Sequence, residues 1–307
     1  MKRINKTSNR DTFNIYSKDY LSDNQNKKGV FVPNLSDKKS FKKFSDKKYK
    51  TTAHPAGSTP DGWLKILLDE TEGLCCYCMR HLPADEVSVE HLIPENFGGL
   101  ENTDEFQEYE YYAQNAPDIL NNVVLGSVFD EEAKRTFIDI EGIIRYPHLV
   151  AHSNLFPACQ DNSPGCSCNR HRDNNRILPM MLIDGIENKV EYTPEGKMEL
   201  HHEDDQMVKQ TLTHLDINSP TLISIRKLWY KFSRKGVFCE WNHTVTYPEM
   251  DNMVRIALDL AITDIIPSEY WDLLKEESDG SLKNFQLFLQ YNWFYTYYLN
   301  KYPLQQP

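Results

Sequence analysis

Cysteines gather in two short stretches of the chain at spacings that suit a metal ion. Cys75 and Cys78 form a C-x2-C pair, and Cys159, Cys166 and Cys168 lie further along. A C-x2-C pair can direct both sulfurs to one point, and two such pairs complete a closed tetrahedral zinc shell. We expect the second pair to be Cys159 with Cys168, although Cys166 could replace either of them. The sequence therefore predicts a structural zinc site.

An isolated C-x2-C pair has two other interpretations, a redox role or thiols that only fill a core. Here the two cysteine groups flank the dipeptide Glu90-His91, and an acid, a histidine and an amide could hold a second ion. A chance array would rarely keep this order, so the arrangement favours a metal site over both alternatives. Cys76 is then a spare thiol.

Local patterns place these residues on short elements. Residues 61–72 carry apolar side chains along one helical face, and Gly73 can end that helix just before the first cysteine pair. Val87 and Val89 alternate with polar residues, as in a half-buried strand. His91 falls at the end of that strand.

A return strand and a short helix are predicted around the second cysteine group. Leu155 and Phe156 suggest the strand, and residues 168–176 suggest a helix on which Asn169 can face the hairpin. The fold class expected is α+β, with a zinc site embedded in a mainly helical chain. In so small a unit, much of the internal support should come from zinc rather than from apolar burial.

These residues resemble the HNH endonucleases, whose core is a ββα-metal unit. The family pattern runs C-x2-C, an acid followed by His, then Asn-Leu, a cysteine five residues after that Asn, and finally Cys-Asn. The matching residues of this chain are Cys75, Cys78, Glu90-His91, Asn154-Leu155, Cys159 and Cys168-Asn169.

A narrower resemblance, over roughly residues 60 to 235, is to PtuB, the HNH component of Septu and retron-associated antiphage systems. It depends on softer motifs. They are Ser153 to Cys159, Asn169-Arg170-His171-Arg172, Thr211 to Asn218, and Arg226.

The resemblance implies a role for each residue of the second site. His91 would be the general base that takes a proton from water, and Glu90 with Asn169 would hold a catalytic Mg²⁺ or Mn²⁺ through hard oxygen atoms. Asn154 would pin the loop that orients His91, and His171 is an alternative ligand to Asn169. Taken alone, a histidine after a strand is more often structural, but the neighbouring acid and the cysteine frame favour catalysis.

Two spacings depart from the family pattern. His91 and Asn154 are separated by 62 intervening residues, and Cys159 and Cys168 by eight, where the family has far shorter connections. Both differences imply insertions. The stretch 121–125 resembles the Asn-Leu strand but lacks the following cysteines. It is therefore the second candidate for that strand, after Asn154-Leu155.

Charge divides the chain unevenly. Residues 1–60 carry fourteen basic and five acidic residues, a net charge of +9, whereas the remainder carries 20 basic and 40 acidic residues. We expect a basic N-terminal arm over 1–60, the nuclease-like domain over 61–185 and a mainly helical region over 186–307. Lysines between 38 and 50 could follow a phosphate backbone, although a solvated arm explains them equally well.

The C-terminal region predicts buried helices. Leu222, Ile225, Trp229 and Phe232 recur at helical spacing and read as core, as do the apolar stretches 250–262 and 285–299. Residues 221–236 contain no acidic residue, and their basic side chains lie on a different side of the predicted helix from Leu222, Ile225, Trp229 and Phe232. The candidate nucleic-acid contacts are Arg170, Arg172, Lys227, Lys231 and Arg234.

The function implied by the resemblance is a metal-dependent phosphodiester hydrolase, an effector of antiphage defence that acts with an ABC-type, SMC-like ATPase. In retron systems a reverse transcriptase and its nucleic acid would be further partners. The net charge of −11 would repel a polyanion except at basic patches, so a partner could supply substrate binding. DNA is the favoured substrate, with tRNA or other RNA as the alternative. A noncatalytic zinc scaffold and a thiol redox protein are the other classes.

The sequence also bears on location. No apolar run reaches the roughly eighteen residues of a membrane span, and Met1-Lys2-Arg3 is followed by polar residues. Cysteines at metal-like spacings suit a reducing compartment better than disulfides do. We therefore expect a cytoplasmic protein without a membrane partner.

Overall fold

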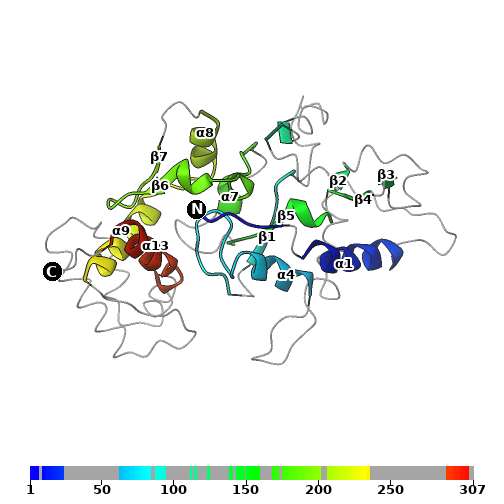
Figure 1. Cartoon of the computed structure of the whole chain (residues 1–307), viewed down its shortest axis with the longest axis horizontal. Helices are drawn as coiled ribbons and strands as arrows, with labels where there is room; N and C mark the ends of the chain where they lie inside the picture. The colour runs from blue at the N-terminus through cyan, green and yellow to red at the C-terminus, as the bar shows by residue number, and fades with distance from the viewer. Residues whose placement is uncertain are drawn as a thin grey trace.

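The computed structural model describes a mixture of helices and small sheets, compatible with the α+β class (Figure 1). The described residues are 1–6, 9–23, 62–83, 87–94, 111–112, 114–115, 123–124, 138–140, 143–148, 150–159, 168–172, 175–201, 206–235 and 288–303. Across these ranges, none of the helices combines the length and the apolar character needed to cross a membrane.

Helices and strands are short. The α-helices are α1 (Arg10–Asp23), α4 (Trp63–Glu70), α7 (Cys168–Arg172), α8 (Gln206–His214), α9 (Pro220–Lys235) and α13 (Trp293–Lys301). The 3-10 helices are η3 (His152–Asn154), η4 (Met180–Leu182) and η5 (Ile186–Asn188). The strands are β1 (Val87–His91), β2 (Val123–Val124), β3 (Ile138–Ile140), β4 (Ile143–Pro147), β5 (Leu155–Cys159), β6 (Val190–Tyr192) and β7 (Met198–Leu200).

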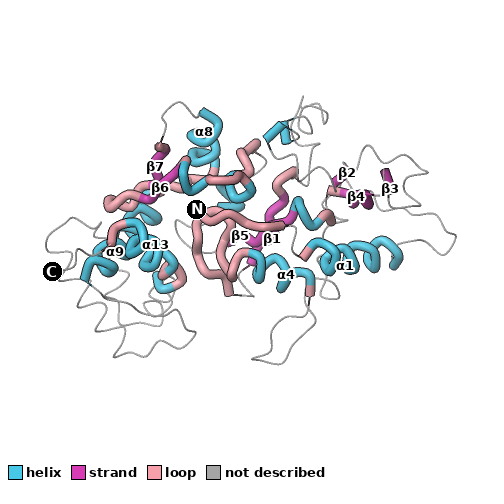
Figure 2. The backbone as a smooth tube through the Cα atoms, viewed as in Figure 1, coloured by secondary structure: helices cyan, strands magenta, loops and turns pink. Residues whose placement is uncertain are grey.

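Strand β1 pairs antiparallel with β5, and this hairpin lies between α1 and the α9 and α13 helices (Figure 2). Its register sets Val87 opposite Cys159 and His91 opposite Leu155. Two further small sheets have the orders β2-β4-β3 and β6-β7. The hairpin confirms the two strands predicted around Glu90-His91 and Leu155.

Helix α4 presents Trp63, Leu64 and Leu67 to the core, as its apolar spacing predicts. It ends where Gly73 adopts a positive φ of 73° and donates its N–H to the Leu68 carbonyl at 2.7 Å. A left-handed residue that closes the last carbonyls is the usual glycine stop of a helix. The predicted helix is therefore confirmed over Trp63–Glu70, inside the expected range 61–72, with Gly73 closing its C-terminal turn.

Proline is tolerated in β5 because of the edge on which it lies. The Pro157 carbonyl accepts the Cys76 N–H at 3.0 Å, and the Leu155 carbonyl accepts the Lys6 ammonium at 2.8 Å. Alternate residues of an antiparallel strand face away from the partner strand, so both carbonyls lie on the outer edge of β5. The missing N–H of Pro157 therefore removes no bond to β1.

The apolar stripe of α9 is confirmed as core. Leu222, Ile225, Trp229 and Phe232 are all buried, and Trp229 stacks on Phe288 with ring centroids 4.7 Å apart. Helix α13 packs against α9. It begins at Trp293, within the stretch 285–299 that the sequence predicts as helical, whereas 250–262 lies outside the described residues.

The N-terminal residues that the structure describes pack against the rest of the molecule. Met1, Ile4 and Phe13 are buried, and the Ile4 N–H donates to the Met181 carbonyl at 2.8 Å. The lysine-rich stretch 38–50, which carried the prediction of a basic arm, lies outside the described residues.

Candidate metal centre and active site

Four cysteines from three separate segments meet in the interior. Cys75 and Cys78 lie in the loop after α4, Cys159 ends β5 and Cys168 begins α7. All four are buried, and their Sγ atoms lie within 4.8 Å of one another. These are the four thiols that the sequence predicts as ligands, and their grouping is confirmed. Cys166, the alternative, lies outside the described residues.

The donor set fits zinc. A tetrahedral shell with Zn–S bonds of about 2.3 Å places its sulfurs about 3.8 Å apart, so only small shifts of the thiols are needed. Burial alone would raise the pKa of Cys75, but hydrogen bonds from neighbouring thiols hold it well below its usual range. A cluster that favours a thiolate in an enclosed position is a site that could hold a structural metal such as zinc.

Backbone bonds close the loop that carries the first pair. A bridge joins Leu74 to His81, and the Cys75 N–H donates to the Arg80 carbonyl at 2.7 Å. Met79 takes a positive φ of 62° inside the loop. The resulting tight turn directs both thiols of the C-x2-C pair inward.

The C-terminal segment braces this loop from outside. Gln290 accepts the His81 N–H at 2.7 Å and the Arg80 side chain at 2.5 Å. The Tyr291 hydroxyl lies 3.9 Å from the Cys78 sulfur. No local sequence pattern indicates this contact, which links residues more than two hundred positions apart along the chain.

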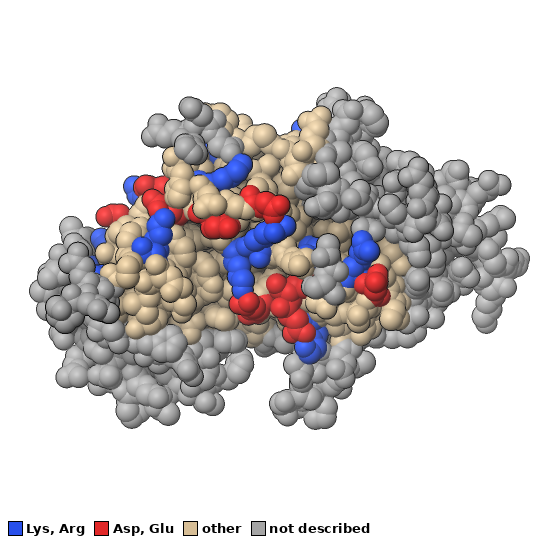
Figure 3. All heavy atoms as spheres, in the orientation of Figure 1, with Lys and Arg blue, Asp and Glu red and all other residues tan. Residues whose placement is uncertain are grey.

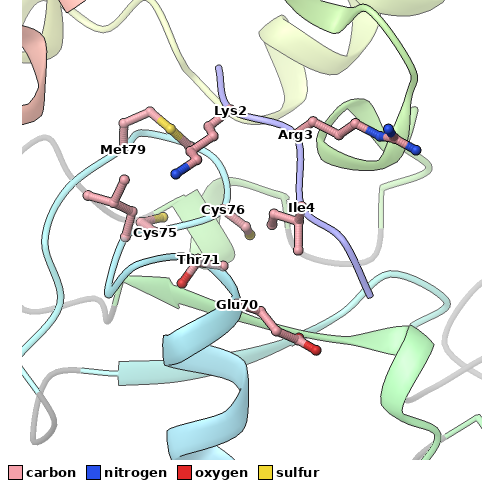
Figure 4. A pocket seen from close by; sticks show the side chains of 9 residues that line it. Lys2, Arg3, Ile4, Glu70, Thr71, Cys75, Cys76 and Met79 are labelled. Carbon is pink, nitrogen blue, oxygen red and sulfur yellow. The ribbon is translucent and has the colours of Figure 1, made fainter. Parts of the chain in front are cut away.

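Cys76 is buried but does not belong to the four-thiol set. It lines a small pocket together with Ile4 and Glu70, as Figure 4 shows. Burial and the neighbouring Cys75 raise its pKa well above the usual value, which favours the neutral thiol. Its placement agrees with the sequence prediction of a spare cysteine.

The hairpin holds the predicted base at the end opposite to the cysteines. His91 is the last residue of β1, and only 4% of it is exposed. Val87, at the other end of β1, pairs with the metal-site residue Cys159. Four residues of strand span about 13 Å, so the cysteine cluster braces the hairpin at a distance from His91. Helix α7 follows on and packs against β5, which completes a ββα arrangement.

Asn154 fixes the loop that follows His91. Its Oδ1 accepts the Ile93 N–H at 2.7 Å, while its Nδ2 donates to the carbonyls of Ile93 at 3.1 Å and His148 at 2.8 Å. The Asn154 carbonyl also accepts the Leu92 N–H at 3.0 Å. The side chain is fully buried, and its bonds fix the backbone that follows His91.

Comparisons of this chain with models of known protein families, with curated proteins and with solved structures found no match. A functional assignment therefore depends on the residues and their geometry.

Arg172 lies inside the site rather than on a nucleic-acid surface. Its guanidinium is ion-paired with Glu90 and donates to the carbonyls of His91 and of Leu92, the latter at 2.5 Å. Arg172 is 1% exposed and Glu90 2%. This corrects the prediction of a phosphate contact: buried against a carboxylate, the guanidinium holds the Glu90-His91 backbone in place.

The other predicted residues of α7 are placed differently. Asn169 lies within the helix, but its side chain is outside what the structure describes. The His171 Nε2 lies 3.7 Å from the Asp216 Oδ2, with both side chains half-exposed. Arg170 is exposed, and its contact with a phosphate stays a prediction.

Only part of the basic side of α9 is accessible for contacts with nucleic acid. Lys227 and Lys231 are half-buried, and Arg234 donates to the Tyr302 carbonyl at 2.6 Å. On the face shown in Figure 3, basic and acidic side chains are interspersed, and the part of the chain that the structure describes shows no continuous basic surface there. Nucleic-acid binding by α9 stays a prediction.

A second group of charged side chains was missed by the sequence analysis. Glu70, the last residue of α4, accepts from Lys6 at 2.7 Å and contacts the His152 Nε2 at 2.6 Å. All three side chains are at most 8% exposed. The last turn of α4 carries no basic residue, so the sequence around Glu70 does not indicate where its cationic partner lies.

Proposed function

We propose that this chain is an HNH-type endonuclease that hydrolyses phosphodiester bonds. The observation that supports it best is the arrangement of the hairpin: Glu90-His91 ends β1, Asn154 clamps the loop behind it, and a four-thiol cluster braces the opposite end. We propose zinc for that cluster, where it would act structurally.

In this proposal His91 accepts the proton of the attacking water, since a neutral imidazole suits proton transfer near pH 7. Arg172 and Asn154 orient it by holding the backbone at and just after His91: Arg172 donates to the His91 and Leu92 carbonyls, and Asn154 accepts the Ile93 N–H. His91 is nearly buried, so a substrate would have to displace a covering residue to reach it.

Glu90 and Asn169, with His171 as the alternative to Asn169, would hold a catalytic Mg²⁺ or Mn²⁺. Bound there, the ion would supply charge neutralisation at the phosphorus and stabilise the departing oxygen. The carboxylate of Glu90 would hold the ion while its Oε1 is also paired with Arg172. His171 would have to leave Asp216 to take part.

DNA is the proposed substrate, and an ABC-type ATPase the proposed partner in an antiphage system. The acidic balance of the chain supports the need for a partner, because the net charge of −11 works against unaided binding of a polyanion. Co-expression followed by size-exclusion chromatography tests the partner. Separate peaks for the two chains would count against it.

Activity is tested by incubating the purified chain, with and without the ATPase, with plasmid, single-stranded DNA and total RNA in Mg²⁺ or Mn²⁺. We expect DNA cleavage that requires the divalent ion and His91. Cleavage of RNA alone would move the proposal to the ribonuclease alternative.

A noncatalytic zinc scaffold is the second candidate. The burial of both Glu90 and His91, and the ion pair that Glu90 makes with Arg172, favour it. Under this reading the hairpin only builds a binding surface, and His91→Ala would leave defence against phage intact.

A further inference from the structure

Three ionisable side chains from distant segments meet on the outer edge of the hairpin. Lys6 comes from the N-terminal segment, Glu70 from the end of α4 and His152 from the start of η3. The Glu70 Oε2 accepts from Lys6 at 2.7 Å, and its Oε1 lies 2.6 Å from the His152 Nε2. Each carboxylate oxygen of Glu70 therefore has its own partner.

The charges of this group balance one another. A carboxylate at the C-terminal end of a helix is disfavoured by the helix dipole, and burial adds to that cost. The Lys6 ammonium offsets both. Burial and the Lys6 charge lower the pKa of His152 to about 4, so the imidazole is neutral and donates from Nε2 to Glu70.

Lys6 also reaches the strand that carries the site. Its ammonium donates to the Leu155 carbonyl at 2.8 Å and lies 4.8 Å from the centre of the Phe156 ring. Leu155 and Phe156 are the register partners of His91 and Glu90. One ammonium thus fixes the two residues of β5 that face the proposed catalytic dipeptide.

His152 connects the same group to the loop beyond His91. It begins η3, whose last residue is Asn154, the side chain that clamps Ile93. A shift of His152 would therefore move the Asn154 clamp, while a shift of Lys6 would move the start of β5. The group supports both sides of the hairpin end.

The N-terminal strap, residues 1–6, holds Lys6 in this position. Ile4 is buried and bonds to the Met181 backbone, Lys2 pairs with Glu72, and Arg3 lies 2.5 Å from Asp184. In Figure 4 the strap crosses over the loop of Cys75 and Cys76, with Glu70 at the end of α4 below it.

We propose that Lys6 is a positioning residue for the hydrolytic site: through Glu70 and the Leu155 carbonyl it sets the end of the hairpin on which His91 lies. The catalytic part of this inference rests on the proposed nuclease function. Its structural part does not.

The test compares Lys6→Met with Lys6→Arg, which keeps the charge and the donors. Hydrogen exchange of the Leu92 and Ile93 amides, both bonded to Asn154, reports on the loop without any activity. We expect Lys6→Met to speed their exchange at least tenfold, while amides of α9 and the bound zinc stay unchanged. Lys6→Arg should restore most of the protection.

In the cleavage assay, Lys6→Met should lower kcat by about ten- to a hundredfold with KM little changed, as misplacement of a reacting group does. An inactive wild type would reject the nuclease proposal, and the exchange data would still decide the positioning of the hairpin.

Unchanged exchange at Leu92 and Ile93 would overturn the inference. So would an equal loss of protection in α9, because Lys6 would then act only on global stability. If Lys6→Met fails to retain zinc, the milder Lys6→Gln is tested instead by the exchange of the Leu92 and Ile93 amides and of the α9 amides. Loss of protection throughout the protein in both variants would also overturn the inference.

Discussion

The Arg172 guanidinium pairs with the Glu90 carboxylate and donates hydrogen bonds to the carbonyls of His91 and Leu92, the two residues that follow Glu90. One buried cation therefore pairs with the acid and holds the backbone carbonyls of His91 and Leu92. It is the first contact to test, because stability and the proposed chemistry both depend on it.

We expect Arg172→Met to destabilise the fold by about 3 to 5 kcal/mol, since removing one partner leaves Glu90 buried and unpaired. Urea unfolding measures the loss. Arg170→Met is the matched control, two positions earlier on the same helix but exposed, and should change the free energy of unfolding by about 0.5 kcal/mol or less. Equal effects of the two substitutions would contradict the assigned role.

Asn154→Asp should destabilise as much as Asn154→Ala, although it is closer in shape. The new carboxylate would face the carbonyls of Ile93 and His148 where Nδ2 now donates. Loss of these buried bonds should cost on the order of 2 to 3 kcal/mol in either variant. Unfolding measurements check this, with Asn175→Ala, an exposed asparagine, as the control. Wild-type stability of Asn154→Asp would argue against the clamp.

Removal of the metal should unfold the hairpin region, because the cluster joins the loop after α4, the end of β5 and the start of α7. We expect about one zinc per chain, lost in Cys159→Ala and kept in Cys76→Ala. Both cysteines are buried, so the pair separates ligation from packing. Metal analysis by mass spectrometry decides, and zinc loss in Cys76→Ala alone would refute the assignment.

His152 should make stability rise with pH between about 4 and 6.5. Its pKa is lowered from 6.5 to about 4 in the folded chain, so the unfolded chain binds more protons in this window. Stability from this group is complete above pH 6.5 and is lost progressively below it, by an amount on the order of 3 kcal/mol.

Urea unfolding of the wild type and of His152→Gln, between pH 4.5 and 7, tests this dependence. The variant should show the smaller slope. His171→Gln, which replaces a half-exposed histidine, is the matched histidine control. Identical slopes for all three proteins would rule out His152 as the titrating group.

The elements around the site could be predicted because their signals are local. The C-x2-C pair, the alternation of Val87 and Val89 and the glycine stop at Gly73 each lie within a few residues of the element they define. The pairing of thiols across the chain also followed, since each pair alone leaves the metal shell incomplete.

Residues whose role depends on distant partners could not be assigned from sequence. Arg172 reads as a surface cation because arginine is rarely buried, and its partner backbone lies 81 positions earlier. Lys6 and His152 lie 64 and 82 positions from Glu70. No local pattern marks such a meeting point.

The most direct test of the proposed function is cleavage by the zinc-loaded protein and its His91→Ala variant, with His201→Ala as a control histidine in a solvent-exposed position. We expect cleavage of DNA in Mg²⁺ or Mn²⁺ by the wild type and by His201→Ala, and a loss of at least a hundredfold in His91→Ala. Cleavage by His91→Ala at the wild-type rate would contradict the account.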